Sequence, residues 1–235
     1  MGVLEKGGGN DPLAPEREGV TKFTLYYTRG APLMAARLAT LQAWRRILFD
    51  LGLIGQELTA AGPIGFGNVS ERFDAQERRG CFLITATQTG HKPTLTPKDY
   101  SLVTGWDLAA NRIDAEGPAP PSSESLTHAI VYALLADVRY VFHGHSPEIW
   151  SHADALGLPS TDRRVPYGTP EMAREVQTLL ALPDSRATGL LVMGGHENGV
   201  ISYAATADAA GDMLIQTLTR ARGLASKMKD KRPSG

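Results

Sequence analysis

The sequence predicts an α/β protein in which helices cover a mixed sheet, and three observations support this class. Segments with the apolar spacing of amphipathic helices alternate with short apolar runs that are typical of buried strands. The chain has no internal repeat, and its 235 residues suit one domain with a sizeable core. We therefore expect a three-layer sandwich over residues 20–228, between a flexible lead-in at 1–19 and a frayed tail at 229–235.

Composition excludes several other classes of protein. The 24 Lys and Arg nearly balance the 25 Asp and Glu, so no charge surplus favours nucleic acid or an anionic membrane surface as a partner. A single cysteine cannot form an intrachain disulfide or a cysteine-rich zinc module. No apolar run approaches the roughly 20 residues that span a bilayer. We expect a soluble, cytoplasmic protein whose six histidines are its most informative residues.

The N-terminal part contains one predicted strand and one predicted helix. Residues 1–20 have neither apolar periodicity nor the apolar core of a secretory signal. Aromatic and β-branched residues at 22–27 favour a short strand. From 33 to 51 the apolar residues recur on one helical face, and Gly52 is placed to end the helix. That face carries Leu38, Leu41, Trp44 and Leu48.

One strand is expected on each side of residue 75. Residues 61–70 read AGPIGFGNVS and predict a glycine-rich loop that runs into a strand at 69–73. The apolar run at 81–86 is typical of a buried strand. A polar connection that contains two prolines follows at 87–99.

The second half of the chain alternates between helices and strands. Ser123 is placed as the N-cap of a helix over 124–135, and Thr169 as the N-cap of a proline-initiated helix over 170–182. The other expected elements are strands at 139–144, 190–193 and 200–204, a short helix at 147–153 and a closing helix at 206–227.

The sequence HGH at 143–145 is the sharpest chemical signal. Residues two apart on a strand point to the same face, so His143 and His145 can present both imidazoles to one point. Neutral imidazole is a preferred ligand of zinc and similar metals. The alternative is a polar strand end with two hydrogen-bonded histidines.

Two further features strengthen the metal hypothesis. His196 lies in a glycine-rich turn directly after the apolar run LLVM, where it can face a site at the edge of the sheet. Glu124 follows Pro121-Ser122-Ser123 and places a carboxylate in the first turn of a helix. For Glu124 the alternative is plain helix capping, with the carboxylate favouring the helix dipole.

Six motifs in the same order along the chain resemble the class II aldolase/adducin family. They are GNVS (67–70), FLITATQTG (82–90), PSSE (121–124), HGH (143–145), PYGTPEMA (166–173) and GGHENGVIS (194–202). The resemblance covers roughly residues 33–224.

The resemblance implies an α/β/α sandwich with a mixed, largely antiparallel sheet, and a cyclic homotetramer with active sites between subunits. It also implies a divalent metal, usually zinc, a glutamate that serves as acid and base, and a pocket for the substrate phosphate. In this chain the implied metal ligands are His143, His145 and His196, the implied acid/base is Glu124, and the implied phosphate ligands are Asn68, Thr89, Gly90, Ser122 and Ser123.

The chemistry of these residues suits an aldolase. Three protein ligands with an open position are typical of a catalytic zinc site. The open position would let a hydroxy-ketone chelate the metal, which would stabilise the enediolate left by proton removal or C–C cleavage. Hydroxyls, an amide and N–H groups at a helix N-terminus would hold a small phosphate without Lys or Arg. The implied enzyme is a zinc-dependent carbon–carbon lyase of carbohydrate metabolism that acts on a phosphorylated sugar.

One departure from the family leaves other reactions open. Family aldolases use a tyrosine as proton donor, from a loop after the HxH motif or from the C-terminal tail. Residues 146–166 and the tail after Arg220 hold no tyrosine, and Tyr167 belongs to a motif in which we expect it to pack. A sugar-phosphate epimerase or dehydratase with the same metal site is therefore an alternative. A non-catalytic, adducin-like assembly module is a third.

The remaining histidines and the cysteine have lesser expected roles. His128 lies one helical turn after Glu124 and is a candidate for orienting the site, while His91 is a candidate for contacting substrate. His152 is expected at the surface. Cys81 is expected to pack in a buried strand rather than to react.

Overall fold

The computed structural model describes residues 3–5, 21–59, 62–73 and 80–230. Most of the predicted lead-in, and residues 231–235 of the predicted tail, lie outside the described residues. Inside the lead-in, Val3–Glu5 forms a strand, β1. At the other end, helix α7 (Ala207–Asp230) continues two residues into the predicted tail.

A nine-stranded sheet forms the middle layer, in the order β1-β2-β8-β7-β6-β5-β9-β11-β10. Its neighbouring strands are antiparallel except for β2 and β8, which are parallel. The mixed, largely antiparallel sheet is therefore confirmed. The strands after β1 are β2 (Thr24–Arg29), β5 (Asn68–Arg72), β6 (Phe82–Thr85), β7 (Tyr100–Asp107), β8 (Arg112–Gly117), β9 (Tyr140–His145), β10 (Leu190–Val192) and β11 (Gly199–Ala204).

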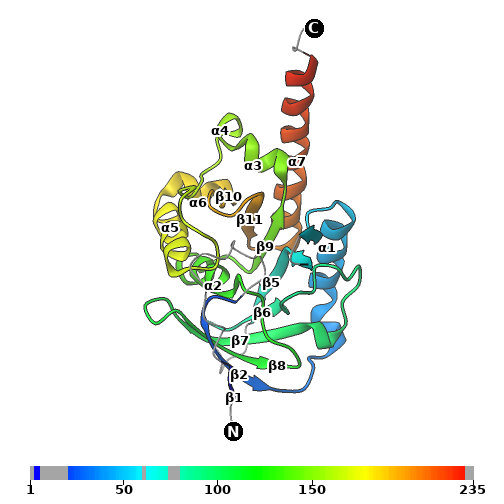
Figure 1. Cartoon of the computed structure of the whole chain (residues 1–235), viewed down its shortest axis with the longest axis vertical. Coiled ribbons are helices and arrows are strands. Elements are labelled where there is room, and N and C mark those ends of the chain that lie inside the picture. The colour runs from blue at the N-terminus through cyan, green and yellow to red at the C-terminus, as the bar shows by residue number, and fades with distance from the viewer. Residues whose placement is uncertain (1–2, 6–20, 60–61, 74–79, 231–235) are drawn as a thin grey trace.

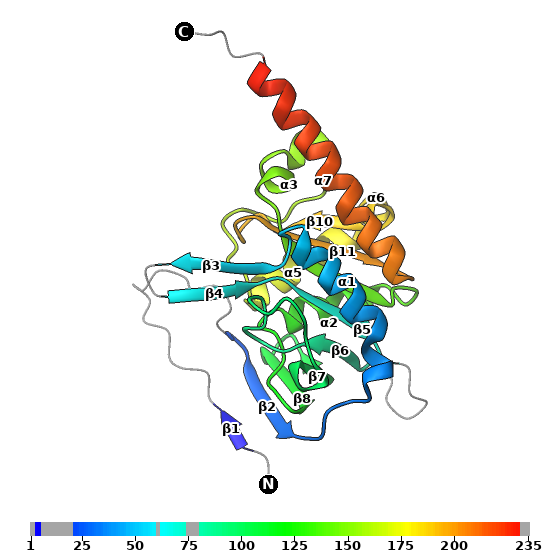
Figure 2. The same cartoon turned by 90° about the vertical axis from the view of Figure 1, so that its right-hand side faces the viewer.

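Helices cover both faces of this sheet and enclose two apolar cores. One core lies beneath α1 (Ala39–Asp50), α3 (Pro147–Ser151), α4 (Ala153–Leu156) and α7. The other lies beneath α2 (Ser125–Leu134) and α5 (Pro170–Ala181), which α6 (Pro183–Thr188) follows. Figure 2 shows α1 and α7 side by side, and Figure 1 shows the end of α7 extending beyond the body of the protein. The predicted three-layer α/β/α sandwich is confirmed.

Alternation along β9 fixes the direction of its histidines. Val141 packs in the core beneath α2 and α5, whereas Phe142 packs in the core beneath α1 and α7. His143 and His145 lie two and four residues after Val141, so both point to the face that α2 and α5 cover. The apolar residues that build the two cores therefore also aim the imidazoles.

Several predicted elements are confirmed to within a few residues. The helix expected at 33–51 is a 3₁₀ turn, η1 (Ala35–Leu38), followed by α1. Gly52 follows α1 with a φ of +74°, as expected of a glycine that ends a helix. Thr169 caps α5, because its hydroxyl oxygen accepts a hydrogen bond from the N–H of Met172.

The prediction that Ser123 caps the following helix is wrong. α2 begins at Ser125, and no side-chain hydrogen bond caps it. A tight turn precedes the helix instead: the Ser122 carbonyl accepts from the N–H of Ser125 at 3.1 Å, and the Ser122 hydroxyl accepts from the N–H of Glu124 at 3.3 Å. Ser122 thus takes the contacts that the sequence pattern assigned to its neighbour.

The loop predicted at 61–70 is wrong in its first half. Gly62–Phe66 is a strand, β4, which pairs with β3 (Gly55–Thr59) as a separate antiparallel hairpin. Glycine and proline are depleted in strands, so the sequence pattern concealed this one. Figure 2 shows the hairpin projecting from the side of the main sheet. β7 and β8 also have no counterpart among the predicted elements.

No helix within the described ranges combines the length and the apolarity that crossing a bilayer requires.

Close packing of α7 on α1 yields a stability prediction. A Cβ added at Gly211 would lie 2.0 Å from the Trp44 ring, whose Nε1 donates to Asp208 at 2.8 Å. We expect Gly211→Ala to lower the free energy of unfolding by about 1–3 kcal/mol through overpacking. Gly223→Ala, on the same helix with open space around it, should raise it by about 0.5–1 kcal/mol through helix propensity. Urea denaturation measures both, and a Gly211→Ala variant as stable as wild type would contradict the packing.

Candidate active site

Strand β9 lies between β5 and β11, and its two histidines point to the face of the sheet that α2 and α5 cover. His143 is opposite Asn68 on β5 and opposite Ile201 on β11, while His145 is opposite Gly199. Directly opposed residues share a face, so the Asn68 side chain lies on the face of His143. The Asn68 side-chain oxygen is buried and has no hydrogen-bond partner in the described part of the chain, which leaves it available to a ligand.

His196 is brought to the same place by the turn between β10 and β11. The turn is closed by two hydrogen bonds, from the N–H of His196 to the Met193 carbonyl at 3.1 Å and from the N–H of Gly199 to the His196 carbonyl at 2.8 Å. A Cβ at Gly195 would lie only 1.9 Å from the Val165 carbonyl oxygen, so the turn can sit this deep only with a glycine there. His196 is 4% exposed.

Three imidazoles converge as a result. One ring nitrogen from each of His143, His145 and His196 lies within 4.8 Å of the other two. The Nε2 atoms of His145 and His196 are 3.1 Å apart. Two imidazole nitrogens on one tetrahedral zinc ion lie about 3.3 Å apart, from Zn–N distances of about 2.0–2.1 Å. The residues present therefore fit a divalent metal.

Hydrogen bonding and burial keep His143 in the form that a metal needs. Its Nδ1 lies 3.0 Å from the Val200 carbonyl oxygen, which can only accept, so Nδ1 carries the proton and Nε2 keeps its lone pair. Burial, together with the neighbouring imidazoles, holds the pKa of His143 well below its ordinary value. His143 is therefore neutral at neutral pH.

Aromatic rings hold the other two imidazoles in place. Phe66 stacks on His145 with ring centroids 4.8 Å apart, and Tyr167 stacks on His196 with ring centroids 4.5 Å apart. The Nζ of Lys22 lies 4.2 Å from the centroid of the Tyr167 ring and donates to the Tyr167 carbonyl at 2.9 Å. Tyr167 packs, as expected, and the segment before β2 supports a histidine of the site.

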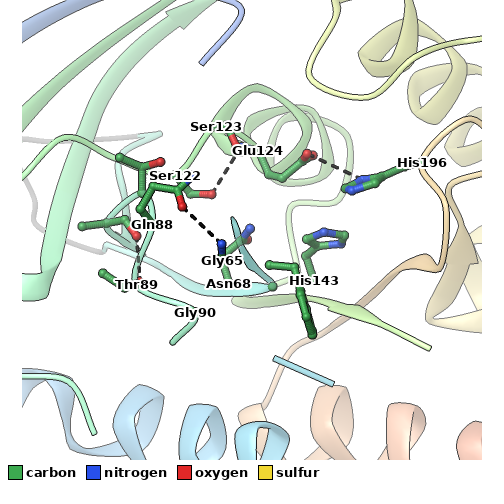
Figure 3. Close-up of a pocket in the computed structure, with 14 residues that line it drawn as sticks. Gly65, Asn68, Gln88, Thr89, Gly90, Ser122, Ser123, Glu124, His143 and His196 are labelled. Atoms are coloured by element: carbon green, nitrogen blue, oxygen red, sulfur yellow. Dashed lines mark hydrogen bonds and ion pairs between the residues drawn. The ribbon is translucent and has the colours of Figure 1, made fainter. Parts of the chain in front are cut away.

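Glu124 faces this cluster from the start of α2. One carboxylate oxygen is 3.7 Å from Nδ1 of His196, and the other accepts from the Thr127 hydroxyl at 3.3 Å. The side chain is 3% exposed. Figure 3 shows Glu124 pointing toward His196 across the pocket.

A small hollow, partly open to solvent, joins these groups. Figure 3 shows Thr89, Gly90 and Ser122 on one side and His143 and His196 on the other. The hollow thus has a hydroxyl-rich end and an imidazole end. Of the sequence-predicted site residues, those that line it are Asn68, Thr89, Gly90, Ser122, Ser123, Glu124, His143 and His196, while His145 joins through the histidine cluster.

Gln88 is a lining residue that the sequence analysis missed. It has a φ of +56°, a strained backbone conformation for a residue other than glycine. Its side-chain oxygen accepts from the N–H of Gly65 at 3.2 Å, which ties β4 to the loop at 87–90. The Thr89 hydroxyl meanwhile donates to the Ala86 carbonyl at 2.8 Å. The sequence offered no signal for Gln88 beyond its place in the motif FLITATQTG.

The other histidines and the cysteine lie away from the hollow. His128 is fully buried, with Nδ1 2.7 Å from the Ser70 hydroxyl, and does not line the pocket; His91 is exposed and does not line it either. His152 is partly exposed at the end of α3. Cys81 is a buried thiol in the core beneath α1, and its Sγ donates to the Thr104 carbonyl at 3.7 Å, as expected of a packing residue.

Fold and site together define an α/β sandwich protein whose polar hollow joins a three-histidine cluster to a buried carboxylate. The sequence profile of the "Class II Aldolase and Adducin N-terminal domain" family matches residues 62–224, more than half of the chain. The chain belongs to this family.

Solved structures share the fold at low sequence identity. The sugar-phosphate aldolase from Thermotoga maritima is 16% identical with a TM-score of 0.64, covering 86% of this chain and 100% of its own. The L-fuculose-1-phosphate aldolase from Thermus thermophilus is 23% identical with a TM-score of 0.59, covering 85% and 100%. YgbL from Klebsiella pneumoniae, a candidate aldolase/epimerase/decarboxylase, is 17% identical with a TM-score of 0.56, covering 85% and 93%.

The buried His128 predicts a loss of stability in acid. Burial lowers the pKa of His128 to about 3, so the folded protein keeps it neutral while the unfolded chain protonates near pH 6.5. The contribution of this pKa difference to the free energy of unfolding is fully present above pH 6.5. Below pH 6.5 the free energy of unfolding falls by about 1.4 kcal/mol per pH unit. We expect His128→Asn to reduce the slope of unfolding free energy against pH by about that amount between pH 6 and 4.5.

Urea denaturation of the metal-free protein at several pH values measures this slope. His91→Asn, which changes an exposed imidazole in the same way, is the matched control. Equal slopes for His128→Asn and wild type would show that His128 is protonated in the folded protein.

Proposed function

We propose that this chain is a metal-dependent lyase of the class II aldolase type, which cleaves or forms a C–C bond in a small phosphorylated hydroxy-ketone or hydroxy-aldehyde sugar. One observation carries the proposal: a single hollow has three converging imidazoles and a buried carboxylate at one end and a hydroxyl-rich loop at the other. Zinc is the preferred ion, because all three ligands are imidazole nitrogens.

His143, His145 and His196 would hold the metal, and no fourth residue of the described chain joins this cluster. A bound divalent cation would supply a Lewis acid that polarises a carbonyl and stabilises negative charge next to it. The protein's own part is to orient the three rings and keep them buried. The Val200 carbonyl and the stacked rings of Phe66 and Tyr167 do this.

Glu124 is the group that would move the proton. Its carboxylate lies beside His196, is shielded from water and is oriented by the Thr127 hydroxyl. A positioned carboxylate of this kind can remove a proton from carbon next to a polarised carbonyl and return it in the reverse reaction. Removing the carboxylate charge should therefore stop proton transfer without emptying the metal site.

The opposite end of the hollow suits a phosphate group. Ser122, Ser123 and Asn68 offer hydroxyl and amide groups, and Thr89 and Gly90 add a hydroxyl and backbone. The N-terminus of α2, a helix of ten residues, begins just beyond Ser123 and favours negative charge there. A ligand with phosphate at this end would place its carbon chain toward Glu124 and the histidines.

A second reaction class is favoured by one observation. No tyrosine lies at 146–166 or after Arg220, and Tyr167 is held in its stack on His196. An epimerase or dehydratase would use the same histidines and Glu124 without that proton donor.

The proposal also includes a cytoplasmic, cyclic homotetramer with active sites between subunits and a role in carbohydrate metabolism. The three converging histidines argue against a non-catalytic assembly module.

Metal content and proton exchange test the proposal together. We expect wild type to bind one zinc per chain. We also expect it to replace a carbon-bound proton of dihydroxyacetone phosphate by deuterium in deuterated water, which NMR measures. His196→Ala should lose the zinc, because a two-histidine site is incomplete. Glu124→Gln should keep the zinc and lose exchange by about 10²-fold or more.

Glu171→Gln, an exposed carboxylate on α5, is the matched control and should behave as wild type. Zinc-loaded wild type that exchanges no proton with any ketose phosphate would overturn the lyase assignment. Product analysis with pentulose phosphates then separates an epimerase or dehydratase from an aldolase.

A further inference from the structure

Arg45 is a buried cation directly behind the loop that forms the hydroxyl-rich end of the hollow. It lies on α1, is 2% exposed, and its Nη2 donates to the Thr89 carbonyl at 2.9 Å and to the Gly90 carbonyl at 3.3 Å. α1 precedes residues 62–224, so Arg45 lies outside the part of the chain that matches the family.

Other side chains of α1 hold the rest of this loop. Gln42 Nε2 donates to the Leu95 carbonyl at 3.0 Å, and Arg46 Nη1 donates to the Thr94 hydroxyl at 3.5 Å. Arg46 is exposed and paired with Asp50, so its charge is already neutralised on the surface. Arg45 differs from this neighbour in being buried.

The charge of Arg45 lacks an anion in direct contact. Its contacts in the described residues are two carbonyls and the Phe49 ring, 5.3 Å from the guanidinium carbon, and no carboxylate there forms an ion pair with it. Asp99 acts on it only through space and is itself paired with Lys92. The Arg45 Nη1 is buried without a hydrogen-bond partner in the same ranges. A buried charge without an ion-pair partner is costly, and an anion bound in the adjacent hollow would offset part of this cost through space.

The two hydrogen bonds of Arg45 also orient the loop. In a trans peptide unit the carbonyl and the N–H point in opposite directions. With the Thr89 and Gly90 carbonyls drawn to Arg45, the N–H groups of Gly90 and His91 face away from it. Neither N–H makes a hydrogen bond within the described residues. Because Gly90 lines the hollow, its N–H is available to an anion that binds there.

We propose that Arg45 is a positioning residue for the anion end of the hollow: it turns the Gly90 N–H group toward a phosphate and stabilises that phosphate from behind the loop. The proposal rests on the proposed function, which places a phosphate there. Arg45 does not touch the phosphate, because the loop lies between them.

Calorimetric titration of the zinc-loaded protein with inorganic phosphate tests this role. We expect Arg45→Met, which keeps the length and loses the charge, to raise the phosphate Kd about tenfold. Arg45→Lys should bind phosphate with a Kd about threefold above that of wild type, because lysine keeps the charge but cannot donate to two carbonyls in the geometry of a guanidinium. Arg222→Met, which changes an exposed arginine on α7, is the control and should bind phosphate as wild type does.

The zinc Kd, measured by chelator competition, is the second readout and should be the same in all four proteins. Loss of zinc and phosphate affinity together in Arg45→Met would mean general collapse of the site and would overturn the positioning role. Unchanged phosphate affinity in Arg45→Met would also overturn it while leaving the proposed function standing.

If Arg45→Met does not fold, Arg45→Lys alone decides. A phosphate Kd raised about threefold at unchanged zinc affinity supports the role, and a wild-type Kd overturns it. Wild type that binds zinc but not millimolar phosphate would overturn the phosphate site of the proposed function itself.

Discussion

Strand β9 is the constraint on which both the core and the site depend. Its alternating side chains place Val141 and Phe142 in opposite cores, and the same alternation sends His143 and His145 to one face. A shift of register by one residue would exchange the cores and turn both imidazoles away. Because β5 and β11 pair with β9 on either side, Asn68 and the turn that carries His196 arrive beside it.

The site contains buried groups that can carry a charge, and specific contacts hold them. His143 avoids a desolvated charge by staying neutral, with its proton directed to the Val200 carbonyl. Glu124 lies between a hydroxyl and an imidazole. Arg45 keeps its charge behind the opposite end of the hollow. The hollow therefore has an end suited to a cation and an end suited to an anion, which is the polarity that the proposed phosphorylated substrate would need.

The sequence predicts the elements whose signal is local. β9 and α5 follow from an apolar run and from the Thr169-Pro170 start, and the His-x-His spacing needs only strand geometry. The β3–β4 hairpin could not be predicted, because its stability comes from strand pairing rather than from strand-forming residues. The role of Arg45 could not be predicted, because nothing in the neighbouring sequence indicates which loop its side chain contacts. Its position four after Leu41 and three before Leu48, on the apolar face of α1, was the one signal that it is buried.

The central claim is that His143, His145 and His196 bind one metal ion with an open position. X-ray absorption at the zinc edge of the zinc-loaded protein measures this most directly. The account predicts three imidazole nitrogens at about 2.0 Å and an additional oxygen. A sulfur ligand, which only a rearranged Cys81 or a methionine could supply, or fewer than three imidazoles would contradict it.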